Sequence, residues 1–417
     1  MNEKEFSKML LSDEYVLWLK DFMHKYPDID DIYFVHNHHL SKEDVEKIDC
    51  LKYLYVELNK YTVKNNLDNQ NIFCYYLKFE DNIYEIEYNG EGYSCTKTNK
   101  SDISYIDYID LKKQYGKQMK INFYFLNDRV LDALRNTDLD KIRYELKRID
   151  APTLVSGVGG SSVVSEFTKK VLGKKNGIIA QNVEPRDFVY DCFPGFKNVI
   201  SCSYSGNNYG VDLSFDNVKK HYLLSNNHFN NPEVTYLHYQ TTLPEENSFI
   251  SLGATLIPIS IIMNYYQDRK EILIPDESFD FDPTCDCFEI FSGIDTSTTS
   301  KYLESTMTES GIGLPIVHDK YSYCHGRSTI STNYNNIAIY LNRNTELDNL
   351  LLKELPRYYK DIIVLESKEK DPILDDYQML IQAMYLTRYI ASKKQKDLSK
   401  VDYNPICKKL YKYNKGV

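Results

Sequence analysis

The sequence predicts an α/β protein in which a parallel sheet flanked by helices occurs twice in tandem. From residue 151 onward, short β-rich runs alternate with helical stretches, which is the pattern of parallel strands joined by helical crossovers. Near residue 276 the alternation restarts in a similar order. We therefore expect a smaller α+β region over 1–126, a first α/β domain with a leading helix over 127–275, and a second α/β domain over 276–417.

The first region is predicted to combine helices with a hairpin. Apolar residues recur at helical spacing in two segments, and two later runs read as strands on either side of the turn Glu80-Asp81-Asn82. The expected helices span 6–24 and 45–63, and the expected strands span 73–79 and 83–88. Nothing in these residues indicates what the region does.

The first α/β domain contains the longest apolar run of the chain, 249–263. This run has 15 residues and includes Pro258 and two serines, so it is too short and too interrupted to cross a bilayer and predicts a buried helix. The leading helix is expected at 129–148, the strands at 153–156, 177–181, 198–203, 221–225 and 234–239, and the helices at 161–172 and 246–266.

The second domain repeats the first at an offset of 136 residues. Segments 154–158 and 290–294 each end a strand, and small hydroxyl residues that open a helix follow each of them. Because loops at the carboxyl ends of parallel strands form the ligand crevice of such sheets, both segments are candidate anion-binding loops. The expected strands lie at 287–292, 314–317, 337–341 and 361–366, and the helices at 297–309, 345–355 and 373–391.

Charge and cysteine content exclude several classes of protein. Fifty basic and sixty acidic side chains give a net charge of -10 without a long block of one sign, so we expect no nucleic-acid and no membrane partner. The first residues show no secretory signal, which predicts a cytoplasmic protein. Nine scattered cysteines, with one close pair at Cys285 and Cys287, indicate reduced thiols, and we expect no metal site.

Two polar loops are the candidate binding elements. The first, 156–162, contains three glycines and three serines, and the second, 201–208, supplies hydroxyls, amides and Gly206. Each alone is equally well explained as a tight strand-to-helix connection or a polar turn that caps a helix. Together they predict one phosphate pocket. Neither loop contains Lys or Arg, which favours a small phosphate ester over a polyanion.

The second loop carries a resemblance to a known family. Its Ser203-Tyr204-Ser205-Gly206 resembles the phosphosugar loop of SIS (sugar isomerase) domains, so residues 151–417 look like a tandem pair of these domains, as in the isomerase module of glucosamine-6-phosphate synthase. Segment 243–251 is similar to the stretch that opens the last helix of such a domain. The resemblance implies that Ser203, Tyr204, Ser205 and Asn208 bind the phosphate of a small phosphorylated sugar. From the first polar loop, we expect Gly157, Ser161 and Ser162 to contribute to the same phosphate pocket.

The same resemblance implies three catalytic side chains, and we expect no cofactor. Segment 324–327 resembles the family's Lys-His-Gly-Pro, and Glu309 stands sixteen residues before His325, where the synthase has its proton-transferring glutamate. The tail 401–409 is similar to the segment that closes over the sugar, with Lys409 as the better match for its lysine and Lys408 as the second.

These residue types suit the movement of a carbonyl between C1 and C2 of a sugar phosphate. A partly desolvated Glu309 can shuttle a proton through a cis-enediol, and the imidazole of His325 can both donate and accept a proton during ring opening. Lys409 can polarise the carbonyl or form a Schiff base with it. In the family the histidine often reaches the neighbouring subunit's pocket, which implies a homodimer.

Departures from the family pattern leave the reaction open. Thr306 stands where the synthase has a lysine, the Lys-His-Gly-Pro segment reads Cys-His-Gly-Arg here, and Asn2 follows the first methionine where the synthase has its catalytic cysteine. Amination is therefore not expected. Isomerisation and the deglycase reaction of fructosamine-phosphate enzymes remain, beside a non-catalytic phosphosugar sensor and an assembly or defence protein in which region 1–126 acts and the tandem domains sense.

Overall fold

The computed structural model of the chain divides by its internal contacts into two units, Met1–Lys113 and Gln114–Val417. The domain boundaries expected from the sequence remain a prediction. The described residues are 32–36, 73–79, 82–88, 93–98, 123, 126–185, 187, 193–206, 218–227, 231–242, 246, 248–267, 279–285, 287–332 and 335–400.

The first unit contains an antiparallel sheet in the order β1-β2-β3-β4. The predicted hairpin is confirmed, since β2 (Phe73–Phe79) pairs antiparallel with β3 (Asn82–Tyr88) over their full lengths. Two strands that the sequence did not reveal, β1 (Ile32–His36) and β4 (Tyr93–Thr98), flank the hairpin. The expected helices at 6–24 and 45–63 lie outside the described residues.

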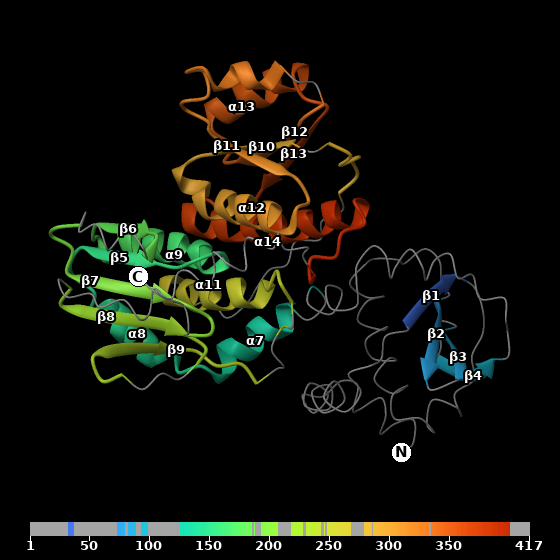
Figure 1. Cartoon of the computed structure of the whole chain (residues 1–417), viewed down its shortest axis with the longest axis horizontal. Helices are drawn as coiled ribbons and strands as arrows, with labels where there is room; N and C mark the ends of the chain where they lie inside the picture. The colour runs from blue at the N-terminus through green and yellow to red at the C-terminus, as the bar shows by residue number, and fades with distance from the viewer. Residues whose placement is uncertain are drawn as a thin grey trace, which may run out of the picture. The chain divides into compact units, whose positions relative to one another are not determined.

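The first α/β domain is built on a parallel sheet in the order β6-β5-β7-β8-β9. The five predicted strands are confirmed as β5 (Thr153–Ser156), β6 (Ala180–Val183), β7 (Asn198–Cys202), β8 (Lys220–Ser225) and β9 (Val234–His238). Helices α9 (Gly160–Val171) and α11 (Leu252–Gln267) lie on the side of this sheet that faces the second domain, as Figure 1 shows.

The leading helix and the second strand of this domain differ from the prediction. The single helix expected at 129–148 is two helices, α7 (Leu126–Asn136) and α8 (Leu139–Lys147), because the Asp138 carboxylate accepts a hydrogen bond from Lys141 N at 3.0 Å and starts a new helix. The strand expected at 177–181 begins at Ala180, because α9 continues into a π-helical turn, η1 (Leu172–Asn176), that ends in left-handed Gly177.

The second α/β domain has a parallel sheet in the order β11-β10-β12-β13. The predicted strands and helices are confirmed within a few residues, as β10 (Cys287–Ser292), β11 (Leu314–Asp319), β12 (Ile337–Asn342), β13 (Asp361–Glu366), α12 (Ser297–Ser310), α13 (Glu346–Glu354) and α14 (Pro372–Lys393). Figure 1 shows α12 and α14 on the face toward the first domain and α13 on the other face.

One hydrophobic core extends across both domains. It contains buried residues of α9, α11, α12 and α14, among them Phe167, Leu256, Leu303 and Leu380. The predicted buried helix in the long apolar run is confirmed as α11, whose residues from Leu256 to Tyr265 are all buried. It starts at Leu252 rather than at Glu246 as expected. Among the helices that the structure describes, none is long and apolar enough to cross a membrane.

Candidate functional site

The two polar loops predicted from the sequence come together at one edge of the first sheet. They follow β5 and β7, which are adjacent parallel strands with Ser156 opposite Ser201 in the register. Because parallel neighbours end at the same edge, the loop after Ser156 and the loop after Cys202 share this edge. The sequence placed both loops at strand ends, and the structure adds that these two strands are neighbours.

The first loop depends on glycine for its close approach to α9. A β-carbon on Gly157 would lie 2.4 Å from Ser161 O, a distance that no other residue type tolerates. Gly159 has φ 56° and ψ -130° and directly precedes α9. Ser162 Oγ donates to Gly159 O at 2.7 Å, so this hydroxyl shapes the turn. Among the described residues, no side chain caps the start of α9, and its first turn carries no acidic residue.

The second loop is a bend held by its own serine. Ser203 is buried, and its hydroxyl oxygen accepts a hydrogen bond from Gly206 N at 3.1 Å. The Tyr204 carbonyl accepts from Ser225 Oγ at 3.2 Å, which ties the bend to the end of β8, and Ser205 is exposed. Asn208 lies outside the described residues.

A further hydroxyl at this edge was not singled out by the sequence. Ser156, the last residue of β5, is 1% exposed, and its Oγ has no hydrogen-bond partner among the described residues. A buried hydroxyl without a partner costs free energy, so it is a candidate contact for a bound ligand or water. The signal was available in the sequence, because Ser156 begins the polar loop that the glycines define.

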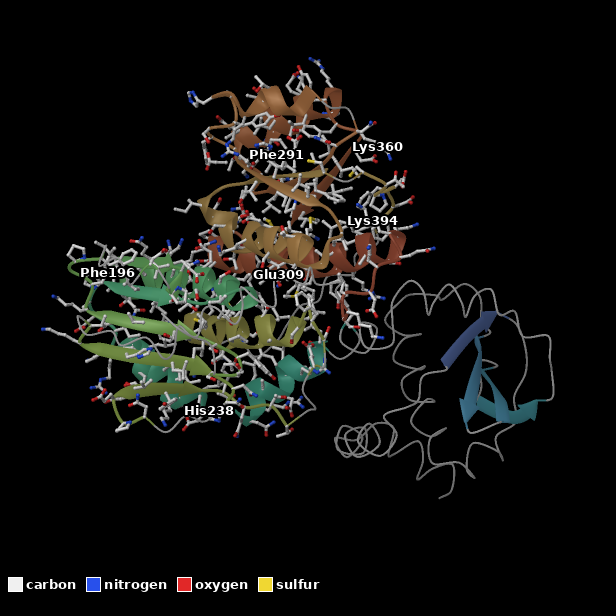
Figure 2. The ribbon with its side chains drawn as sticks, viewed as in Figure 1. Phe196, His238, Phe291, Glu309, Lys360 and Lys394 are labelled. Atoms are coloured by element: carbon white, nitrogen blue, oxygen red, sulfur yellow. The ribbon has the colours of Figure 1, made fainter. Side chains whose placement is uncertain are left out.

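Glu309 of the second domain lies against the first loop. It sits in the last turn of α12, and Figure 2 shows it on the side of the second domain that faces the first. Its Oε1 lies 3.5 Å from the place where a β-carbon on Gly159 would be, and it accepts a hydrogen bond from Ser305 Oγ at 2.7 Å. Burial raises the pKa of Glu309, with the Ser305 hydrogen bond acting in the opposite direction. The carboxylate thus lies against the first loop and is partly desolvated.

A second carboxylate, Glu246, is built into the same edge of the sheet. It forms a buried ion pair with Arg129 at 2.8 Å and accepts hydrogen bonds from Ser251 Oγ and, at 2.9 Å, from Gly253 N at the start of α11. Burial raises the pKa of Glu246 although Arg129 opposes this. The sequence marked the segment around Glu246 through the family resemblance, but it could not show the pairing with a residue 117 positions earlier.

His325 lies at the other end of the second sheet from Glu309. The crossover helix α12 runs back along the sheet, so Glu309 lies where β11 begins, whereas His325 follows where β11 ends. The six residues of β11 extend for about 20 Å. His325 is exposed, in a turn where its N–H donates to Ser322 O at 3.0 Å. One chain therefore does not bring His325 and Glu309 together.

The remaining predicted catalytic residue is not placed. Lys409 and its alternative Lys408 lie outside the described residues. Within the described residues, no cluster of three or more His, Cys, Asp or Glu side chains is arranged to hold a metal ion. In the one close cysteine pair, the Cys285 thiol donates to the Cys287 carbonyl at 3.3 Å, and burial raises the pKa of both thiols, that of Cys287 to about 11.

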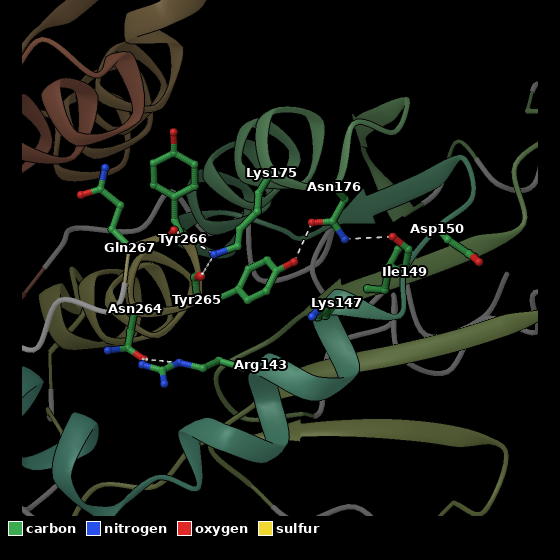
Figure 3. Close-up of a pocket in the computed structure, with 10 residues that line it drawn as sticks. All are labelled: Arg143, Lys147, Ile149, Asp150, Lys175, Asn176, Asn264, Tyr265, Tyr266 and Gln267. Atoms are coloured by element: carbon green, nitrogen blue, oxygen red, sulfur yellow. Dashed lines mark hydrogen bonds between the residues drawn. The ribbon is translucent and has the colours of Figure 1, made fainter.

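A cavity of about 600 Å³ lies at the opposite, amino end of the first sheet (Figure 3). Its described lining includes the cations Arg143, Lys147 and Lys175 and one acid, Asp150. These cations stand beside helix carboxyl ends: Lys175 Nζ donates to the carbonyls of the last turn of α11, and Lys147 ends α8. Positive charge at helix carboxyl ends is favourable by itself, so this basic character needs no ligand.

Comparison with solved structures shows which known proteins share this fold. No protein-family model matches the chain, and no curated protein matches its sequence. Among solved structures, it is similar to the C-terminal domain of glucosamine-fructose-6-phosphate aminotransferase from Francisella tularensis, with a TM-score of 0.54 and 13% identity over 69% of this chain and 99% of that chain. Tagatose-6-phosphate ketose/aldose isomerase from Escherichia coli matches with a TM-score of 0.54 and 14% identity, over 70% and 97% of the two chains.

A third similar structure is glucosamine-6-phosphate deaminase from Thermotoga maritima, with a TM-score of 0.52 and 13% identity over 67% of this chain and 94% of that chain. These matches cover nearly the whole of each known structure, so both α/β domains of the present chain take part. The resemblance inferred from the sequence is confirmed at the level of the fold: residues of the second unit form two tandem SIS-type α/β domains.

Proposed function

We propose that the chain binds a hexose or amino-sugar 6-phosphate at the carboxyl edge of the first sheet and acts on it as an aldose-ketose isomerase or as a deglycase. The phosphate is held by the loops after β5 and β7, through main-chain N–H groups and hydroxyls. In support of this, the loops are adjacent, the start of α9 carries no acidic side chain, and the similar structures bear the names of sugar-phosphate proteins.

The observation that carries the catalytic part is the contact between Glu309 and Gly159. In the isomerase reaction Glu309 takes the proton from C2 of the open-chain aldose while the C1 carbonyl oxygen gains one from solvent, which yields a cis-enediol. The O2 hydroxyl then loses its proton to solvent and Glu309 returns its own proton to C1, so that the ketose forms without net gain or loss of protons. A buried carboxylate with a raised pKa is suited to both steps near neutral pH.

The other catalytic roles require a second subunit and the tail of the chain. Because His325 lies at the far end of β11 from Glu309, we propose that it acts at the crevice of a partner subunit in a homodimer, where it opens the sugar ring. Lys409, or its neighbour Lys408, completes the site from the tail by polarising the sugar carbonyl or by forming a Schiff base with it.

A thermal-shift screen with hexose 6-phosphates and amino-sugar 6-phosphates tests the binding proposal. A rise in Tm with one of these sugars, lost in Ser203→Ala, is expected, because Ser203 holds the bend after β7. No shift with any of these sugars would refute phosphosugar binding. Exchange of the C2 proton of the bound sugar in deuterated water then tests catalysis, with Glu304→Gln, an exposed carboxylate on the same helix, as the matched control for Glu309→Gln.

A non-catalytic phosphosugar-binding role is the second candidate. It is favoured by one observation: of the three predicted catalytic side chains, only Glu309 lies at the crevice within the described part of one chain. Binding without any exchange at C2, in a protein that light scattering shows to be a monomer, would favour this role over the enzyme.

A further inference from the structure

The helix that follows the first strand of each parallel sheet begins differently in the two domains. Helix α9 follows β5 and helix α12 follows β10, at positions that the internal repeat makes equivalent. Among the described residues, α9 begins without any capping side chain. At the start of α12, by contrast, a carboxylate from another helix is already in place. That carboxylate belongs to Asp376 of α14.

Asp376 binds the start of α12 as a bound oxyanion would. Its Oδ2 accepts a hydrogen bond from Thr298 N at 3.1 Å, and its Oδ1 accepts one from Thr299 N at 3.1 Å and one from Thr299 Oγ1 at 2.7 Å. Asp376 is completely buried, so each of these hydrogen bonds is made away from water. Free N–H groups at a helix start together with a hydroxyl are the elements of an anion site.

The cation that forms an ion pair with Asp376 comes from the first domain. Lys170 of α9 donates to Asp376 Oδ2 at 2.5 Å and to the main-chain carbonyl of Asp295 at 2.5 Å. Its side chain is 9% exposed. Since α9 and α12 run antiparallel against each other, Lys170 holds one end of the pair while Gly159 and Glu309 meet at the other end.

One hydroxyl at the start of α12 makes no hydrogen bond to Asp376. Thr298, whose N–H binds Asp376, is completely buried, and its Oγ1 has no hydrogen-bond partner among the described residues. A carboxylate has two oxygens, and both are engaged by the two N–H groups, Thr299 Oγ1 and Lys170. A tetrahedral oxyanion has further oxygens that such a hydroxyl can bind. The start of α12 therefore carries one buried hydroxyl that the hydrogen bonds to Asp376 leave unused.

We propose that the second domain contains an oxyanion site that is permanently filled by the carboxylate of Asp376. The carboxylate occupies the place that a bound oxyanion would take at the start of this helix. Through Lys170, the filled site fastens the second domain to the first and sets the position of α12, and with it that of Glu309. This proposal does not depend on the proposed activity, because its readout is stability in the absence of any sugar.

Removal and chemical replacement of the carboxylate test the proposal. Asp376→Ala should lower Tm by about 5–10 °C, because Lys170 and two N–H groups lose their partner in a buried setting. Added formate or phosphate should restore at least about a third of that loss relative to chloride at equal ionic strength, by binding the emptied site. The wild-type protein, whose site is filled, should show a much smaller difference between these salts.

The control is Asp371→Ala, which removes the carboxylate that caps the start of α14 itself at a half-buried position. It should lower Tm without a specific response to formate, because water reaches that helix start. If Asp376→Ala responds to the salts no more than wild type or Asp371→Ala does, the proposal is overturned. Should the alanine variant fail to fold, Asp376→Asn decides: it keeps the shape but not the charge, and a Tm equal to that of wild type would refute an oxyanion site.

Discussion

Glu309 of the second domain lies against Gly159 of the first, with Glu309 Oε1 3.5 Å from the position that a β-carbon on Gly159 would take. Two segments separated by 150 residues therefore lie side by side at the carboxyl edge of the first sheet. The contact joins the glycine-rich loop before α9 to a partly buried carboxylate in the last turn of α12. The function proposed for the chain depends on this contact.

Substitution of Gly159 tests this arrangement directly. Gly159→Ala should destabilise the protein by about 1–3 kcal/mol, because φ 56° with ψ -130° is a conformation that residues with a β-carbon rarely adopt. Gly177→Ala is the matched control: Gly177 also has positive φ, but a β-carbon there meets nothing within 4 Å, and the expected cost is about 1 kcal/mol. Urea unfolding measures both. Equal costs for the two variants would contradict the strained loop.

The pKa of Glu309 predicts a pH dependence of catalysis. Burial raises this pKa above its ordinary value of 4.5, and the general base must be deprotonated to take the proton from C2. The rate of C2 proton exchange should therefore fall as the pH drops through the raised pKa, and this acid limb should disappear in Glu309→Gln together with at least about 10²-fold of the rate. An unchanged rate in Glu309→Gln with normal sugar binding would exclude Glu309 as the base.

The same shift has a consequence for stability. Because the folded protein binds the Glu309 proton more tightly than the unfolded chain does, this group contributes to stability below pH 4.5, and that contribution is lost as the pH rises through the raised pKa of the folded state. Glu309→Gln, which cannot ionise, should therefore be at least as stable as wild type at neutral pH. Urea unfolding of both proteins at pH 5 and pH 8 measures the difference, and a clearly less stable Gln variant at pH 8 would contradict a desolvated carboxylate.

The positions of His325 and Glu309 at opposite ends of the second sheet predict complementation between subunits. Glu309→Gln and His325→Ala should each be inactive as homodimers. Refolded together in equal amounts, half of the dimers are mixed and each of these has one crevice with both residues intact, so about one quarter of the wild-type activity should return. No recovery, from a mixture that light scattering shows to be dimeric, would refute the shared site.

The buried pair of Arg129 and Glu246 should stabilise the start of α11. Both side chains are at most 5% exposed, so Arg129→Met leaves a buried carboxylate without its partner and should cost about 3–5 kcal/mol. In the double variant with Glu246→Gln, the cost should be less than the sum of the two single costs, because no unpaired charge remains. A double-mutant cycle in urea measures the coupling. Additive costs would show that the two charges do not interact.

Much of the fold could be predicted because it is encoded locally. Each predicted strand and helix of the two α/β domains exists, and their errors concern ends and interruptions, as at Asp138 and Gly177. Those errors arise from single capping or glycine residues, whose effect depends on hydrogen bonds that periodicity does not show. The strands β1 and β4 were missed because their runs are short and lie in polar surroundings.

The candidate site could be predicted only in part. The loops after β5 and β7 carry their signal in glycines and hydroxyls close together in the chain, and the structure confirms that they are neighbours. Asp376 and Lys170 gave no such signal, and for Glu246 the resemblance marked only its segment and not its pairing with Arg129. Each is an ordinary charged residue in the sequence, and its importance arises from a partner more than one hundred positions away.

By itself, the order of amino acids determined the class of the fold, its repetition and the polar bends at the strand ends, since these follow from side-chain periodicity and from backbone conformations that a few residue types allow. Only the tertiary structure decided which carboxylate lies against the first loop, which one fills the start of α12, and that His325 lies far from Glu309. The physical reason is that burial and charge pairing depend on which distant segments come into contact. The local sequence around each residue does not specify those contacts.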